Sequence, residues 1–187
     1  FGTACEAGPY RRGQYAAVKL LGKSLQYTVD LSGAVCGCNA ALYLTALPQS
    51  SGKTSCSDYY CDAAKVCGVN CAEIDVQEAN QFAFVTTLHT PDDAPGVGGG
   101  YGASRRTWNS TVYGPGARCI DTQQAFRVSA AFPLDGKGLL TAMVVTLFQE
   151  GTNCTLSARL DEYHPSGRDG LAELATSLQA GMTPVIS

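Results

Sequence analysis

The chain has 187 residues, of which 45% are hydrophobic and 16% are charged, with a net charge of −3 and no basic block. This length fits one domain over residues 1–187, and the charge excludes a nucleic-acid partner, which needs a positive protein surface. No apolar run approaches the roughly 20 residues needed to span a bilayer, so we expect no membrane partner.

Short apolar runs punctuated by turn residues dominate the first part of the chain. Residues 15–21 and 25–31 are two such runs, and the glycine-containing turn at residues 22–24 predicts a β-hairpin between them. Residues 40–47 form a third apolar run, which ends at Pro48. Because proline and the polar residues after it favour loops, we expect this strand to end there.

The strand pattern returns in the second half of the chain. Three further apolar runs are separated by glycine-containing turns and lie at residues 125–132, 139–149 and 155–160. Several short strands at such spacing predict an all-β sandwich.

Two segments depart from the strand pattern. Residues 92–101 are rich in glycine and predict a loop without strand potential, which borders a binding surface. Residues 170–180 place leucines at helical spacing, and Gly181 follows as a C-terminal cap. We therefore expect one short helix near the end of the chain.

Three acidic residues lie within six positions of an otherwise apolar run at residues 71–80. In a strand, Glu73 and Asp75 point to the same face because side chains alternate with period two. Glu78 is out of phase with them. We therefore predict a β-bulge between Asp75 and Glu78, whose extra residue brings all three carboxyl groups onto one face.

Carboxyl groups that are this crowded cannot all ionise at low cost, so we expect one raised and one low pKa. Retaining glycoside hydrolysis requires that division, with an ionised nucleophile and a protonated acid roughly 5 to 5.5 Å apart. We expect Asp75 to hydrogen-bond Glu73 and to tune its charge. A solvated acidic strand face and a cation site of carboxylate oxygens remain as alternatives.

The chain contains nine cysteines, and they lack the paired spacing of a zinc ribbon. Disulfide bonds are therefore expected, together with a secreted, extracellular location. Two sequons, at Asn109 and Asn153, favour the same route and predict a glycoprotein. Because nine is odd, at least one thiol is free, pairs with a partner chain, or has its partner in a segment outside this sequence.

The acidic stretch resembles the E-x-D-x-x-E-A-N signature of glycoside hydrolase family 7, the cellobiohydrolases and endoglucanases. One such motif is weak, since the related family 16 glucanases share it. Further blocks follow the family's order along the chain, however, and six ordered blocks are hard to produce by chance. Among them are Cys36-Gly-Cys-Asn39-Ala-Ala-Leu-Tyr43, Tyr60-Cys61-Asp62, Glu73-Ile-Asp75-Val-Gln-Glu78-Ala-Asn80 and His89 in Thr-Leu-His-Thr-Pro.

The resemblance implies a role for each matching residue. Glu73 would be the nucleophile, Asp75 the assisting carboxylate and Glu78 the acid/base, with no cofactor and no metal. The positions that would bind substrate are Asn39, Tyr43, Tyr60, Asp62, His89 and Arg106.

A structural role remains open for each substrate-binding candidate. The two tyrosines could be core aromatics, Asn39 a backbone-satisfying amide and Asp62 a turn residue. His89 could lie in a surface loop, and the role of Arg106 could be no more than to balance the charge of nearby acids.

The departures from the family concern length and aromatic residues. The chain is less than half as long as the family's catalytic domains, so any binding face should be open. Trp108 is the one tryptophan, where the family lines its cleft with several, and Gln77 stands where a tryptophan commonly precedes the acid/base. The chain ends at Ser187, where the family enters a strand, so we expect a C-terminally truncated domain whose incomplete sheet could accept a partner chain.

The resulting prediction is a disulfide-linked jelly-roll β-sandwich of two antiparallel sheets, concanavalin-like, with one helix. It would be a retaining endo-β-1,4-glucanase acting on a cellulose-type β-glucan in an open cleft. The resemblance also implies a Cys61–Cys71 disulfide, and we further predict Cys56–Cys67 and Cys119–Cys154. The alternatives are a non-catalytic carbohydrate-binding or extracellular structural protein on the same fold, or a β-1,3/1,4-glucanase.

Overall fold

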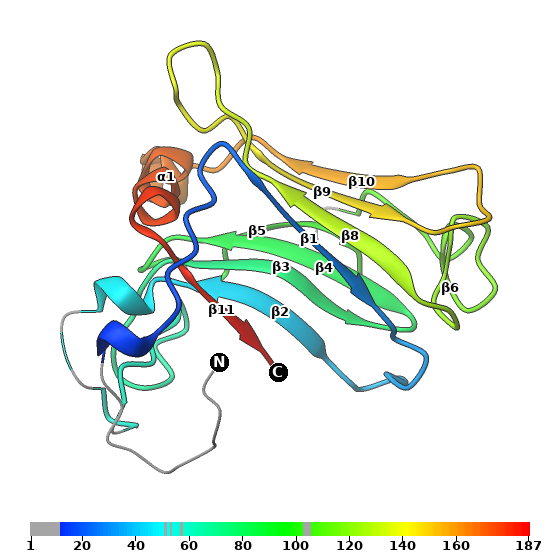
Figure 1. Ribbon diagram of the computed structural model, residues 1–187, viewed down its shortest axis with the longest axis horizontal. Helices are drawn as coiled ribbons and strands as arrows, with labels where there is room; N and C mark the ends of the chain where they lie inside the picture. The colour runs from blue at the N-terminus through cyan, green and yellow to red at the C-terminus, as the bar shows by residue number, and fades with distance from the viewer. Residues whose placement is uncertain (1–11, 51, 53, 57, 103–105) are drawn as a thin grey trace.

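The computed structural model describes residues 12–50, 52, 54–56, 58–102 and 106–187. One antiparallel sheet has the strand order β1 (Ser24–Val29), β8 (Phe126–Ala131), β9 (Met143–Phe148), β10 (Leu156–Leu160). The other has the order β11 (Thr183–Ile186), β2 (Ala40–Thr45), β3 (Glu73–Asn80), β4 (Ala83–His89), β5 (Val97–Tyr101). Figure 1 shows these two sheets as stacked layers, which confirms the predicted β-sandwich.

Shorter elements complete the described fold. The strands β6 (Tyr113–Gly114) and β7 (Ile120–Asp121) form a small parallel pair. The helix α1 (Gly170–Ala180) lies at one end of the sandwich (Figure 1). Three short 3-10 turns are η1 (Arg12–Gln14), η2 (Leu47–Gln49) and η3 (Pro165–Gly167).

The core lies between the two sheets, where strand alternation directs apolar side chains inward. In β9, Met143, Val145 and Leu147 are buried, and the residues between them are more exposed. From the facing sheet, Ile74 and Phe84 are fully buried. Burial of apolar area at about 25 cal/mol per Å² is the main force that holds the two layers together.

The predicted C-terminal helix is confirmed at both ends. The Asp169 carboxylate accepts a hydrogen bond from the Ala172 amide at 3.0 Å, which caps the first turn. Gly181 ends the helix with φ of 108°, a conformation that favours glycine. The leucines of the helix pack into the core.

The predicted hairpin at residues 15–31 is wrong. Its second run forms β1, but β1 pairs with β8 rather than with the first run. Residues 15–21 lack period-two alternation, and Val18 forms an isolated bridge with Met182, just after α1.

The predicted loop at residues 92–101 is also wrong in its second half, which forms β5. Its glycines are what permit the strand. A side chain at Gly99 would meet Leu160 of the facing sheet at 3.2 Å. Gly100 has φ of 104°, and an added Cβ there would clash with the Phe84 carbonyl oxygen. The glycine run therefore marks close packing rather than a flexible turn.

All three predicted disulfides are present, at Cys56–Cys67, Cys61–Cys71 and Cys119–Cys154. Cys36 and Cys38 are exposed and carry free thiols. Within the described residues, no helix is long and apolar enough to cross a membrane.

Candidate active site

A β-bulge in β3 is the feature that assembles the site. Against β2, Leu42 pairs with Gln77 and the next residue, Tyr43, pairs with Asp75, so Val76 is the extra residue. The register between β3 and β4 also shifts between Asp75 and Glu78. The predicted bulge is therefore confirmed.

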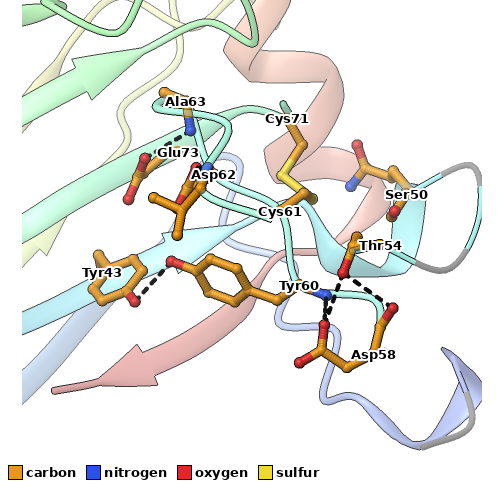
Figure 2. The surroundings of a disulfide bond; sticks show 12 residues. Tyr43, Ser50, Thr54, Asp58, Tyr60, Cys61, Asp62, Ala63, Cys71 and Glu73 are labelled. Atoms are coloured by element: carbon orange, nitrogen blue, oxygen red, sulfur yellow. Dashed lines mark hydrogen bonds between the residues drawn. A yellow bond between two sulfur atoms is a disulfide. The ribbon is translucent and has the colours of Figure 1, made fainter. Parts of the chain in front are cut away.

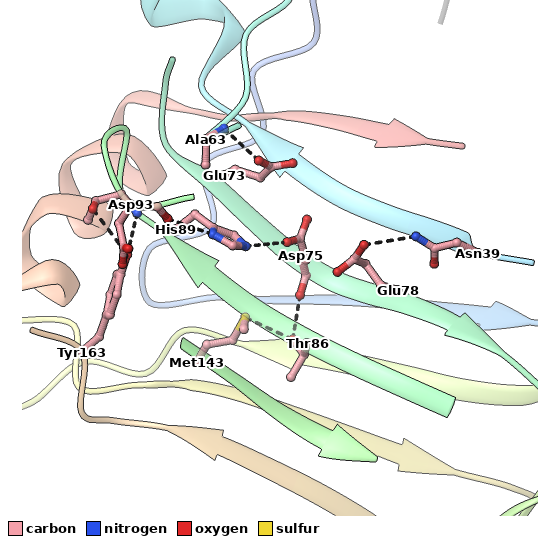
Figure 3. A network of polar contacts seen from close by, with 11 residues as sticks. Asn39, Ala63, Glu73, Asp75, Glu78, Thr86, His89, Asp93, Met143 and Tyr163 are labelled. Carbon is pink, nitrogen blue, oxygen red and sulfur yellow. Dashed lines mark hydrogen bonds and ion pairs between the residues drawn. The ribbon is translucent and has the colours of Figure 1, made fainter. Parts of the chain in front are cut away.

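The bulge places the three acids in a row along one face of β3. Figure 3 shows their carboxyl groups following one another along the strand, with Asp75 in the middle. Ile74, Val76 and Gln77 are buried. On the opposite side of the strand, the Thr86 hydroxyl donates a 2.7 Å hydrogen bond to the Asp75 carbonyl oxygen, which satisfies a backbone group at the bulge.

Glu73 is half-buried at the start of β3, beside the loop that precedes it. The Ala63 amide donates a 2.9 Å hydrogen bond to Oε2 of Glu73, and the Cys61–Cys71 disulfide ties this loop to the strand (Figure 2). Burial, followed by the nearby negative charge of Asp75, raises the pKa of Glu73 to about 7. A fixed carboxyl group that titrates near neutrality is a candidate for acid, base or nucleophilic chemistry.

Asp75 is buried and hydrogen-bonds His89 rather than Glu73. The Nε2 atom of His89 lies 3.0 Å from Oδ2 of Asp75, and Nδ1 lies 3.0 Å from the Asp93 carbonyl oxygen. A carbonyl and a carboxylate both accept, so the geometry favours a doubly protonated imidazole. Burial opposes that charge, but the hydrogen bond and charge of Asp75 raise the pKa of His89 overall. Asp75 thus acts on Glu73 through its charge.

Glu78 is partly exposed and has a polar neighbour from the adjacent strand. The Asn39 side-chain amide donates a 3.1 Å hydrogen bond to Oε1 of Glu78 (Figure 3). Asn39 directly precedes β2, so the β2–β3 pairing fixes this contact.

Tyr43 and Tyr60 also lie at this face. Their hydroxyl groups are 3.0 Å apart, and Tyr43 is directly opposite Asp75 in the β2–β3 register (Figure 2). Burial raises the pKa of both Tyr43 and Tyr60, so both hydroxyl groups are neutral donors at ordinary pH.

Asp62 has the turn role that the sequence left open. It is buried, and its Oδ1 accepts a 3.0 Å hydrogen bond from the Val66 amide. Figure 2 shows it next to Glu73, within the loop closed by the Cys61–Cys71 disulfide. Its carboxylate therefore orders the loop that supplies the Ala63 amide.

Arg106 is exposed and lies apart from the three acids. The following residue, Thr107, hydrogen-bonds Gly100 of β5, and β5 is separated from Glu78 by β4. Within the described residues, no hydrogen bond or ion pair joins Arg106 to the carboxyl row. Trp108 is also no surface aromatic, since it is buried and its indole nitrogen donates to the Ser157 carbonyl oxygen.

Two positioning groups were not predicted from the sequence. The Ala63 amide carries no signal in sequence, because any residue but proline supplies the same N–H. Thr86 left a faint one, as a hydroxyl residue at a core-facing position of an apolar strand. Such a residue needs a partner, and the bulge provides it.

Two hollows, of about 380 and 390 Å³, lie on the outer face of the four-stranded sheet, where Thr28, Arg127 and Phe148 line both. Neither is lined by the three acids. In the part of the chain that the structure describes, no group of His, Cys, Asp and Glu side chains could hold a metal ion.

Comparison with known proteins gives one consistent family. Residues 10–65 match the family model of glycosyl hydrolase family 7. Endoglucanase EG-1 of Hypocrea jecorina is 29% identical over 211 residues, covering 94% of this chain and 44% of the relative. The chain thus spans less than half the length of this curated relative.

Solved structures agree at the level of the fold. A family 7 cellobiohydrolase from Daphnia pulex superposes with a TM-score of 0.65 at 19% identity, over 94% of this chain and 59% of that one. An endoglucanase I complexed with cellobiose gives a TM-score of 0.67 at 20% identity, over 94% and 58%. Together these findings confirm the resemblance to glycoside hydrolase family 7 and the jelly-roll sandwich.

Proposed function

We propose that this relative of glycoside hydrolase family 7 hydrolyses internal β-1,4-glucosidic bonds of a cellulose-type glucan with retention of configuration. The observation that carries the proposal is the row of Glu73, Asp75 and Glu78 on one face of β3. A binding module has no use for three crowded carboxyl groups, whereas double displacement needs an acid and a nucleophile. The likeness to endoglucanase EG-1 supports the same reaction.

In the first step, the Glu78 carboxylic acid donates its proton to the glycosidic oxygen as the bond from that oxygen to the anomeric carbon breaks. The Glu73 carboxylate attacks the anomeric carbon and forms a glycosyl ester. The Ala63 amide holds one oxygen of Glu73, and the other is the attacking atom. The Asn39 amide orients Glu78 toward the leaving oxygen.

In the second step, the Glu78 carboxylate removes a proton from water, and the resulting hydroxide adds to the anomeric carbon. The bond to Glu73 breaks, which restores its carboxylate and releases a sugar with the original configuration. His89 holds the Asp75 carboxylate in place beside the nucleophile, and the negative charge of Asp75 stabilises the positive charge that develops on the sugar ring.

The reaction should have an acidic limb near neutrality. Glu73 must be ionised to attack, and its pKa is raised to about 7. We therefore expect kcat/KM to fall about tenfold for each pH unit below that value. A limb near pH 4 would assign the nucleophile to another group.

We expect an open binding face, which suits an endo-acting enzyme with modest affinity. With Trp108 buried, the family's usual tryptophan platform is missing, and sugar stacking contributes strongly to grip. We expect preference for soluble or amorphous glucan over crystalline cellulose. Three disulfides support passage through an oxidising, secretory compartment.

The test is hydrolysis of three polymers by the wild type and by a Glu73→Gln variant. Carboxymethylcellulose, barley β-glucan and laminarin separate β-1,4, mixed-linkage and β-1,3 specificity. We expect new reducing ends from the first two with the wild type only. Release from laminarin alone would assign a different glucanase, and no release above the variant would leave a non-catalytic binding protein.

A further inference from the structure

Three side chains of β3 hold the segment that enters β2. The Asn80 amide donates to the Cys38 carbonyl oxygen at 2.9 Å, and the Gln77 amide donates to the Ala40 carbonyl oxygen at 3.0 Å. Between these two contacts, Asn39 donates to Glu78 at 3.1 Å. The Asn39–Glu78 hydrogen bond thus lies between two other hydrogen bonds that join β3 to the same segment.

Of the two flanking contacts, the one from Gln77 is anchored in the core. Gln77 is 3% exposed, and its Oε1 accepts a 3.1 Å hydrogen bond from the Tyr27 hydroxyl on the facing sheet. Burial raises the pKa of Tyr27 far above its ordinary value, so the hydroxyl stays a donor. Gln77 therefore links β1, the bulge and the start of β2.

Packing of the core alone does not require this buried polar link. A buried amide that loses a partner is strongly destabilising, so an apolar side chain would be the simpler solution at a core position. Gln77 also directly precedes Glu78 in the bulged part of β3. It therefore controls both partners of the Asn39–Glu78 hydrogen bond, one through Ala40 and the other through the backbone.

We propose that Gln77, tethered by Tyr27, is a positioning residue for proton donation by Glu78. The inference rests on the proposed glucanase function and extends it. Gln77 does not touch substrate. It holds Asn39 and Glu78 in register, so that the acid points at the leaving oxygen.

The test uses two substrates that differ in their need for an acid. The sugar that leaves from cellotetraose must be protonated by an acid. The dinitrophenolate of 2,4-dinitrophenyl β-cellobioside is a good leaving group and departs without protonation. We expect Gln77→Leu to lower kcat/KM, which reports the first step, about tenfold on cellotetraose and less than twofold on the dinitrophenyl glycoside.

A matched control is Gln149→Leu. Gln149 is also buried, and its amide donates to the Asp121, Gln124 and Ala125 carbonyl oxygens, remote from the acid row. It should lower the melting temperature similarly and leave the ratio of the two substrates unchanged. The milder Tyr27→Phe, which removes only the hydroxyl, should change the ratio in the same direction as Gln77→Leu.

The outcomes separate the two proposals. If Gln77→Leu slows both substrates equally, or if Gln149→Leu changes the ratio as strongly, Gln77 has no positioning role. If the rate losses caused by Asn39→Ala and Gln77→Leu on cellotetraose multiply in the double variant, the link through Asn39 is wrong. If the wild type cleaves neither substrate, the glucanase function itself fails.

Discussion

At the residue scale, the site is governed by the charges of Glu73 and His89. The two residues are directly opposite in the β3–β4 register. Each has a raised pKa, Glu73 mainly through burial and His89 through Asp75, against the effect of its own burial. Both groups therefore bind a proton more firmly in the folded protein than in the unfolded chain.

The unfolding free energy should consequently fall as pH rises from 5 to 8. The Glu73 contribution is lost between its ordinary value of 4.5 and about 7, and the His89 contribution is lost above 6.5, through its folded-state pKa. In Glu73→Gln, we expect the pH 5 to pH 8 difference to shrink by about 1 to 2 kcal/mol, allowing for partial exposure. Urea unfolding at both pH values measures it.

The exposed Glu162→Gln variant is the control, and it should retain the wild-type difference. An unchanged difference in Glu73→Gln would mean that Glu73 titrates normally in the folded state.

Much of this residue-scale picture was accessible from sequence. The three acids and the need for a bulge follow from strand periodicity alone. The partner of Asp75 could not be predicted from strand periodicity, because His89 lies fourteen residues away and meets Asp75 only through the β3–β4 pairing. Nor could the sequence assign the raised pKa to Glu73, which depends on the burial of its carboxyl group.

At the element scale, irregularities in β3 and β5 shape the sheet that carries the site. The bulge reorients Glu78, and the glycines of β5 let the two layers approach closely. The first was predictable because three acids demanded one face. The second was not, because glycine favours loops unless tertiary packing requires its missing side chain.

The Thr86 hydroxyl should stabilise the bulge. Thr86→Val keeps the shape of the side chain but leaves the Asp75 carbonyl oxygen without this donor. We expect a loss of about 1 to 2 kcal/mol in unfolding free energy and a fall in kcat of several-fold. Thr122→Val is the control, because Thr122 is also fully buried and its hydroxyl donates to the Gln81 carbonyl oxygen, outside the bulge. It should affect kcat less, and equal losses for both variants would argue against a specific role for Thr86.

The close packing of β5 should make Gly100 intolerant of a side chain. Gly100→Ala forces a positive φ on alanine and drives its Cβ against the Phe84 carbonyl oxygen. We expect a cost of about 3 kcal/mol or more, seen as a lowered melting temperature. Gly136→Ala, which has open space around it, should be nearly neutral. A tolerated Gly100→Ala would restore the loop interpretation.

At the scale of the whole molecule, the sandwich is a rigid base and the disulfides secure its loops. Cys61–Cys71 closes a sequence separation of 10 residues beside Glu73, and Cys119–Cys154 closes one of 35 away from it. The fold class was predictable from strand spacing and the Cys61–Cys71 pairing from the family resemblance, whereas cysteine positions alone do not determine connectivity. The pairing of β1 with β8 was not, because it joins distant segments.

Removal of the two disulfides should therefore affect stability and kcat to different extents. In the chain-entropy account, the longer loop stabilises more, by roughly 4 against 3 kcal/mol. The Cys119→Ala/Cys154→Ala double variant should lose more stability, while Cys61→Ala/Cys71→Ala should lose more kcat because the Ala63 donor moves. Thermal unfolding and hydrolysis assays on both variants measure this. Parallel losses in the two variants would contradict the special role of the Cys61–Cys71 loop.

The central claim is that Glu73 and Glu78 perform a double displacement at a β-glucosidic bond. Proton NMR of cellotetraose hydrolysis, followed before mutarotation equilibrates the products, tests it most directly. We predict that the β-anomer of the newly formed reducing end accumulates first, and that Glu73→Gln forms none. First appearance of the α-anomer, or equal hydrolysis by Glu73→Gln, would contradict the account.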